Sequence, residues 1–295
     1  MRDLINCIAH NSSEGNLLIG TERAALFDCG MAFCAAETLR SVRQALGDRP
    51  LDYILMTHTH YDHIGALPFF RREWPDLQAV TTQTGADVLL KDTPRRVIRE
   101  LSAVAAERET RCGSHGEALD ITDYSDDAFR AEVVVKEGDI IPLGGVSAEV
   151  IETPGHTRDS LSYYIPELEL LLINETPGVL MPDGTVYPCY LTSYADTVRS
   201  IEKCRAKPYR RLALPHRGVV SKADADGFFD KALAANAACL NFIGGMADRG
   251  LGLEEMLELF YERYASDILL TYQPKEAFFA NARATVAATL RERGG

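Results

Sequence analysis

A run of six residues, His58-Thr59-His60-Tyr61-Asp62-His63, carries three imidazoles and one carboxylate. Side chains two residues apart fall on the same face of an extended chain, so His58 and His60 can converge on one metal ion. If the chain then turns into a helix, Asp62 and His63 point toward a second position beside the first. Imidazoles and a carboxylate suit zinc, and iron or manganese when more oxygen ligands are present. The run therefore predicts a metal site, whereas a solvated His-rich loop would lack the buried strand before it and matching ligands downstream.

Three later segments each end an apolar run with one further residue of metal-ligand type. His156 follows a Pro-Gly turn, Glu175 follows the run 170–173, and His216 follows the run 212–214. A two-metal arrangement results if His58, His60 and His156 hold one ion, Asp62, His63 and His216 hold the other, and Glu175 bridges them. Two such ions hold a water or hydroxide between them and lower its pKa toward neutrality. That hydroxide is the predicted nucleophile, and Asp62, besides binding metal, would orient it or accept its proton.

The spacing of these motifs resembles that of the metallo-β-lactamase-fold hydrolase superfamily, in its glyoxalase II and lactonase-like branch. The resemblance rests on three motifs: H-x-H-x-D-H at 58–63, T-P-G-H-T at 153–157 and L-P-H-R-G at 214–218. It covers roughly residues 5–220. The resemblance implies an α/β fold, a four-layer αββα sandwich with a dinuclear site at one edge of its two sheets. It also implies two divalent metal ions, zinc above all, with iron or manganese as alternatives.

One position departs from the family pattern. The family usually has an aspartate as the bridging ligand, whereas the aligned residue here is Glu175, with Asn174 as the competitor if the register shifts by one. A neutral amide would bridge two cations poorly, so we favour Glu175. Its longer side chain is expected to alter metal spacing or metal choice.

The resemblance narrows the activity to hydrolysis of a small ester, thioester or lactone. Flavodiiron oxygen reductases carry a Glu where this chain has His60, and persulfide dioxygenases lack the full set of second-site ligands. Three alternatives stay open: an iron-dependent redox enzyme on the same fold, a β-lactam hydrolase, and a metal-binding scaffold without catalysis. Tyr190 and Tyr194 flank a segment that could line the pocket mouth, and they are predicted as substrate contacts.

Composition limits the partners. The net charge of −12 and the pI near 5.1 argue against a nucleic-acid surface, which needs clustered positive charge. No long uncharged apolar stretch and no signal-peptide pattern occur, so we expect a cytoplasmic protein that acts on a small molecule and not at a membrane. The seven cysteines form no C-x-x-C pair, which favours buried thiols over disulfides or a thiolate zinc site.

The elements that must position the ligands can be placed along the chain. Apolar patterning predicts a hairpin from segments 16–19 and 25–28, a helix at 35–46 and a strand at 51–56 that leads into the histidine run. A helical and loop insertion is expected at about 94–129, within a domain spanning residues 1–220. Residues 221–295 are predicted to form a C-terminal helical extension that packs on the core, caps the pocket or forms a homodimer surface.

Overall fold

The computed structural model describes residues 4–7, 15–112, 121, 126–223, 225 and 227–294. The chain divides into two compact units, the first comprising residues 1–151 and 163–170, and the second comprising residues 152–162 and 171–295. Each unit has its own cluster of buried apolar side chains. The predicted domain limit at residue 220 stays a prediction.

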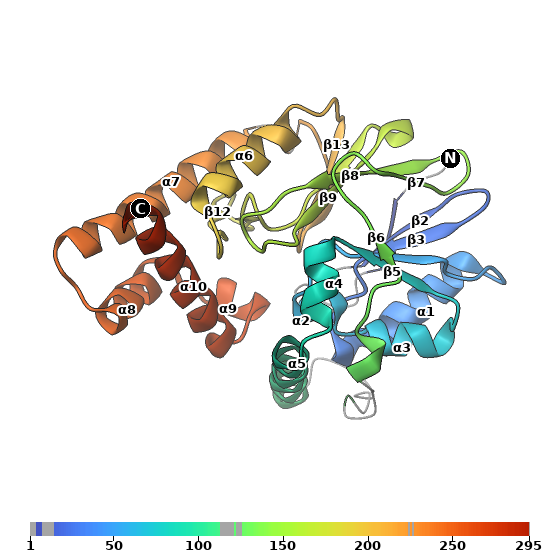
Figure 1. Cartoon of the computed structure of the whole chain (residues 1–295), viewed down its shortest axis with the longest axis horizontal. Coiled ribbons are helices and arrows are strands. Elements are labelled where there is room, and N and C mark those ends of the chain that lie inside the picture. The colour runs from blue at the N-terminus through green and yellow to red at the C-terminus, as the bar shows by residue number, and fades with distance from the viewer. Residues whose placement is uncertain are drawn as a thin grey trace. The chain divides into compact units, whose positions relative to one another are not determined.

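The first unit contains a six-stranded sheet in the order β1-β2-β3-β4-β5-β6 (Figure 1). Its strands are β1 (Leu4–Asn6), β2 (Asn16–Ile19), β3 (Ala24–Phe27), β4 (Tyr53–Leu55), β5 (Gln78–Thr81) and β6 (Val133–Val134). The predicted hairpin is confirmed, because β2 pairs antiparallel with β3. From β3 to β6 the strands run parallel, so β3 and β4 bring the residues that follow them to the same edge. The residues at that edge include Asp28 after β3 and the histidine run after β4.

Helices pack against this sheet through a shared apolar core. They are α1 (Ala35–Leu46), α2 (Tyr61–Ile64), α3 (Leu67–Glu73), α4 (Gln83–Leu89) and α5 (Asp92–Cys112), with short 3₁₀ turns at Ala32–Cys34 and Asp126–Ala128. The helix predicted at 35–46 is confirmed as α1. The helical part of the predicted insertion is α5, which packs against α2, while residues 113–120 and 122–125 lie outside the described residues.

A buried arginine fixes the end of that insertion. The guanidinium of Arg71, on α3, donates to the carbonyl oxygens of Ala128 and Arg130, each at 2.8 Å, and to a carboxylate oxygen of Glu132 at 2.9 Å. These bonds secure the chain where it enters β6. The buried charge is thus paired and hydrogen-bonded, as a buried cation must be.

The second sheet has the strand order β14-β13-β10-β9-β8-β7. Its strands are β7 (Ile140–Pro142), β8 (Ser147–Glu152), β9 (Leu161–Ile165), β10 (Leu170–Leu172), β13 (Arg211–Leu214) and β14 (Gly218–Ser221), and β9 is followed by a 3₁₀ turn at Pro166–Leu168. Both outer pairs, β7 with β8 and β13 with β14, are antiparallel. A separate small hairpin joins β11 (Val179–Leu180) to β12 (Val186–Tyr187).

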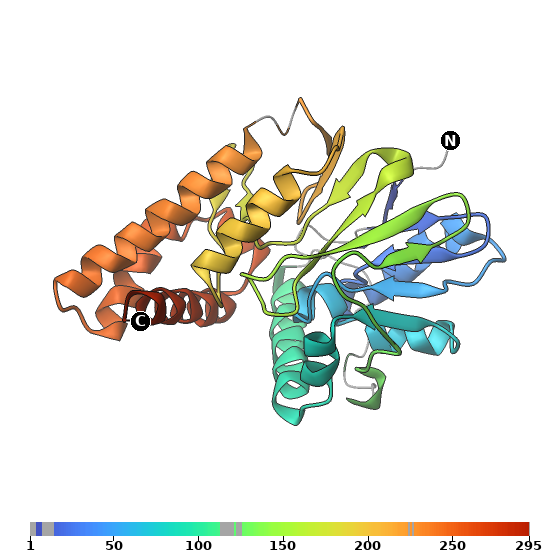
Figure 2. The same ribbon diagram turned by 45° about the horizontal axis from the view of Figure 1, so that its top comes forward.

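The second unit also contains helices, which follow the small hairpin. They are α6 (Tyr194–Arg205), α7 (Phe228–Asp248), α8 (Leu253–Tyr264), α9 (Leu269–Tyr272) and α10 (Lys275–Gly294). The helices α6 and α7 lie side by side in both views, and α10 contacts α6, α7 and α8 (Figure 1; Figure 2). The helical character predicted for the C-terminal extension is confirmed by α7, α8 and α10, whereas the four-residue α9 is too short to give a periodic pattern. None of the described helices is both long enough and apolar enough to span a membrane.

Candidate metal centre

The histidine run leaves β4 in an extended conformation and then turns into α2. His60 is extended, with φ −78° and ψ 155°, and caps α2, which carries Asp62 and His63. The rings of His58 and His60 are 4.5 Å apart between centroids, and their ligand nitrogens lie within 4.8 Å of each other. On α2, His63 Nε2 is 3.7 Å from a carboxylate oxygen of Asp62. Within the first unit, therefore, the strand end presents one pair of ligand atoms and the helix presents another.

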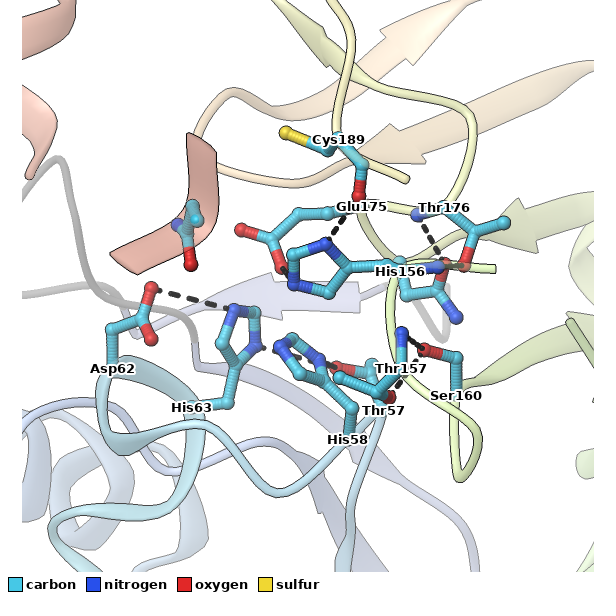
Figure 3. A network of polar contacts seen from close by, with 12 residues as sticks. Thr57, His58, Asp62, His63, His156, Thr157, Ser160, Glu175, Thr176 and Cys189 are labelled. Carbon is cyan, nitrogen blue, oxygen red and sulfur yellow. Dashed lines mark hydrogen bonds and ion pairs between the residues drawn. The ribbon is translucent and has the colours of Figure 1, made fainter. Parts of the chain in front are cut away.

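Behind these histidines lies a buried network that no sequence motif indicated. The Asp28 carboxylate accepts hydrogen bonds from the Thr57 backbone N–H and the Thr57 hydroxyl, both at 2.7 Å. It also lies 2.8 Å from His63 Nδ1, while the Thr57 hydroxyl oxygen lies 3.1 Å from His58 Nδ1. Figure 3 shows Thr57 beside both imidazoles. The sequence signal that could have identified Asp28 is its place directly after β3, the strand that runs parallel to β4.

This network assigns the protons of both rings. A carboxylate only accepts hydrogen bonds, so His63 Nδ1 donates to Asp28 and its Nε2 keeps the lone pair in the neutral ring. The single proton of the Thr57 hydroxyl is given to Asp28, so that oxygen accepts from His58 Nδ1. An Nδ1–H held by a carboxylate or hydroxyl is the usual support of a histidine that ligates a metal through its other nitrogen.

In the second unit, a tight turn after β8 positions His156. Gly155 in that turn has φ 145°, and a side chain there would collide with Thr197, so only glycine fits. The backbone N–H of His156 donates to the Thr176 hydroxyl at 3.2 Å. Its Nδ1 lies 2.7 Å from the carbonyl oxygen of Cys189 (Figure 3). Because a carbonyl only accepts, Nδ1 carries the proton, and Nε2 is the nitrogen available to a metal.

The Glu175 carboxylate places one oxygen toward each of two histidines. Its Oε2 is 3.2 Å from His156 Nε2, and its Oε1 is 2.6 Å from Nε2 of His216, which follows β13. The side-chain amide of Asn174 makes hydrogen bonds to other residues. Its N–H₂ donates to the Thr153 hydroxyl and to the Leu161 carbonyl oxygen, and its oxygen accepts from the Thr176 backbone N–H. The geometry in the second unit therefore favours Glu175 over Asn174 as the residue that two cations could share.

These contacts are chemically consistent with bound cations. In the neutral His156 ring, Nε2 presents a lone pair, and so does the facing oxygen of Glu175. The same holds for His63 Nε2 and the Asp62 carboxylate. Two acceptor atoms that face each other repel unless a proton or a metal ion lies between them. A set of imidazoles and carboxylates is one that zinc, iron and manganese accept, so the residues present fit the predicted metals.

The two predicted tyrosine contacts differ in their placement. Tyr190 is fully buried, and its hydroxyl lies 2.8 Å from the Thr289 hydroxyl oxygen on α10. Burial raises the pKa of Tyr190, so the phenol stays protonated. Tyr190 thus packs in the interior of the second unit, and its role as a substrate contact stays a prediction. Tyr194 begins α6, half-buried against the Tyr190 ring, and its role stays a prediction.

Comparison with known proteins connects these motifs to a family. Residues 16–216 match the protein-family model of the metallo-beta-lactamase superfamily. The acyl-coenzyme A thioesterase MBLAC2 of Gallus gallus is 25% identical over 212 residues, covering 70% of this chain and 69% of that protein. The nitric oxide reductase of Moorella thermoacetica is 28% identical over 162 residues, 55% of this chain but only 33% of the reductase.

A solved structure gives the same result for the fold. The metallo-beta-lactamase family protein TTHA1429 from Thermus thermophilus superposes with a TM-score of 0.60 at 22% identity, covering 100% of this chain and 93% of that one. This likeness confirms the predicted fold class, with helices following the metallo-β-lactamase core. Since the family match extends over more than half of the sequence, from β2 to His216, the chain belongs to the metallo-beta-lactamase superfamily.

Proposed function

We propose that this protein is a metal-dependent hydrolase that acts on a small ester, thioester or lactone. The observation that carries the proposal is the Glu175 carboxylate, which offers a separate oxygen to each of two histidines from different motifs. A carboxylate placed in this way suits two cations better than one. The proposed ligands of the first ion are His58, His60 and His156, those of the second are Asp62, His63 and His216, and Glu175 is shared.

The chain's own groups would prepare the reaction in three ways. Acceptors on Nδ1 of His63 and His156 fix the tautomer, so that Nε2 of each neutral ring is the nitrogen that offers a lone pair to a divalent ion. Divalent ions bound there would supply an acidified water and polarise the substrate carbonyl. Asp62, at the first turn of α2 and part-exposed, is placed to orient that water or take its proton.

The substrate class rests on the family and on one relative. The chicken relative is named as an acyl-coenzyme A thioesterase, and it aligns over 69% of its length. A thioester carbonyl is electrophilic and its thiolate leaving group is stable, so it suits a site that supplies a nucleophile and positive charge. Small-molecule substrates, a cytoplasmic setting and a homodimer are part of the same proposal, and the acidic net charge of −12 accords with an absence of nucleic-acid partners.

The test combines metal analysis with a substrate panel. We expect two equivalents of zinc in the isolated protein, and turnover of acyl thioesters or lactones that chelation abolishes and added metal restores. His60→Ala and Asp62→Ala should each remove turnover while thermal melting shows a folded protein. Unchanged turnover by either variant, in samples of verified metal content, would refute the proposal.

A redox enzyme is the second candidate, since the Moorella relative is named as a nitric oxide reductase. It predicts two irons in the isolated protein and consumption of an oxidant such as oxygen or peroxide. A colourless zinc protein that hydrolyses esters or thioesters would exclude it. Hydrolysis of a β-lactam in the same panel would instead support the third alternative, a β-lactam hydrolase.

A further inference from the structure

One buried hydroxyl in the first unit contacts ligands that belong to both proposed metal sets. The Thr57 oxygen lies 3.1 Å from His58 Nδ1 and 3.3 Å from His63 Nδ1. His58 is assigned above to the first ion and His63 to the second. Figure 3 shows Thr57 close to both rings.

We propose that Thr57, held by Asp28, is a positioning residue that couples the two metal sites, so that its loss weakens both. The inference rests on the proposed dinuclear arrangement and concerns metal binding, not the identity of the substrate. Thr57 is not itself a ligand in this proposal; it acts through the two imidazoles.

The number of hydrogen bonds that the Thr57 hydroxyl can make decides which groups it orients. A threonine hydroxyl has one proton and two lone pairs. The proton goes to Asp28, at 2.7 Å, which leaves both lone pairs facing the two Nδ1 atoms. His63 Nδ1 has the closer acceptor in Asp28, at 2.8 Å, so Thr57 is its secondary contact, whereas Thr57 accepts directly from His58 Nδ1. The hydroxyl thus orients His58 directly and His63 through Asp28.

Burial and backbone geometry make this arrangement rigid. Asp28, Thr57, His58 and His63 are each at most 3% exposed, so water cannot replace a lost contact without a cavity. The Thr57 backbone N–H also donates to Asp28, at 2.7 Å, which fixes the carboxylate from a second direction. The rings of His58 and His63 lie 4.1 Å apart between centroids, so a rotation of one crowds the other. Displacement of either ring is therefore transmitted to both metal sets.

The experiment is a metal titration of Thr57→Val, which keeps the shape of the side chain and removes the hydroxyl. Metal-free protein is titrated with Co²⁺ against a competing chelator, with the Co²⁺ absorption bands reporting each site. We expect the affinity of both sites to fall about 10- to 100-fold, the range found when outer-shell partners of metal ligands are removed. Thr57→Ser, which restores the hydroxyl, should titrate like the wild type.

A matched control comes from the same unit. Thr81, at the end of β5, is fully buried, and its hydroxyl makes no hydrogen bond to any described residue. Thr81→Val should leave both affinities unchanged. If Thr57→Val does not fold, Asp28→Asn provides the second variant, because Asp28 has φ 55° and asparagine accepts that conformation readily. We expect Asp28→Asn to weaken both sites as well.

Two outcomes would overturn the coupling: affinities within about twofold of wild type at both sites, or a loss confined to one site. The measurement needs no substrate. Failure to find hydrolysis would overturn the proposed function and leave this titration intact, whereas wild-type protein that binds a single Co²⁺ would overturn the dinuclear arrangement itself.

Discussion

Glu175→Asp is the sharpest perturbation of the proposed centre, because it keeps the charge and removes one methylene. Glu175 places Oε2 3.2 Å from His156 Nε2 and Oε1 2.6 Å from His216 Nε2. One carboxylate therefore reaches toward two histidines with two different oxygens. The shorter side chain should lose at least one of these approaches, and with it one of two bound metal ions.

The size of the effect follows from bond lengths. Removing a methylene withdraws the carboxylate by about 1.5 Å, the length of one C–C bond. Zinc–oxygen bonds to carboxylates are only about 2.0–2.2 Å long, so a retreat of this size cannot be absorbed at both histidines without movement of the backbone. Loss of a direct ligand should cost at least as much as loss of an outer-shell partner, a factor of about 10–100 in affinity. That factor corresponds to about 1.4–2.8 kcal/mol.

The assay is competitive metal titration with elemental analysis of the bound stoichiometry. We expect two ions per chain in the wild type and about one in Glu175→Asp. Glu167→Asp is the matched control, because it makes the same change at an exposed glutamate whose carboxylate bonds to Ser147, away from the histidines. Two ions bound to Glu175→Asp with wild-type affinity would refute the reasoning, since an aspartate would then bridge equally well from this backbone.

Three further substitutions test the surroundings of the site. Gly65→Ala should destabilise the fold by about 1–3 kcal/mol and weaken metal binding, since the added methyl collides with the Tyr61 carbonyl in α2; thermal melting and metal titration measure both. Tyr190→Phe should lower the free energy of unfolding by about 1 kcal/mol and leave turnover unchanged, because the phenol bonds inside the second unit. A large loss of turnover at unaltered stability would support its predicted role as a substrate contact. Cys189→Ala should titrate with metal like the wild type, since His156 bonds to the main-chain carbonyl; a weakened site would show that the thiol itself contributes.

Much of the architecture was predictable because its signals are local. The run at 53–55 is apolar and short, and it ends at a turn, which identifies a buried strand whatever lies beside it. Period-2 spacing then places His58 and His60 together, and the turn after His60 places Asp62 and His63 on α2. Local patterning also identified the long C-terminal helices, whereas α9 forms a single turn that periodicity does not detect.

The partners of the histidines were not predictable in the same way, since they lie far away in the chain. Asp28 is 35 residues from His63, and Cys189 is 33 residues from His156. The second contact uses a backbone carbonyl, which every residue possesses, so no residue type reveals it. The burial of Tyr190 was not predictable for a related reason: an aromatic residue in a segment without periodicity can face a pocket or the interior, and only the position of α10 determines which.

Two residues beside the proposed centre have a strained backbone conformation, which their residue types alone do not reveal. Among the described residues, three that are not glycine have positive φ, and two of them are Asp28, at 55°, and His216, at 59°. A non-glycine residue in this region costs about 1–3 kcal/mol, so such positions persist only where the surrounding structure enforces them. Asp28 directly follows β3 and has its carboxylate beside His63, while His216 lies two residues after β13 and has its ring beside the Glu175 carboxylate. Glycine would relieve the strain at either position but would remove the polar group. The strain at these two strand ends is therefore best explained by the need to hold an acceptor on His63 and an imidazole on Glu175.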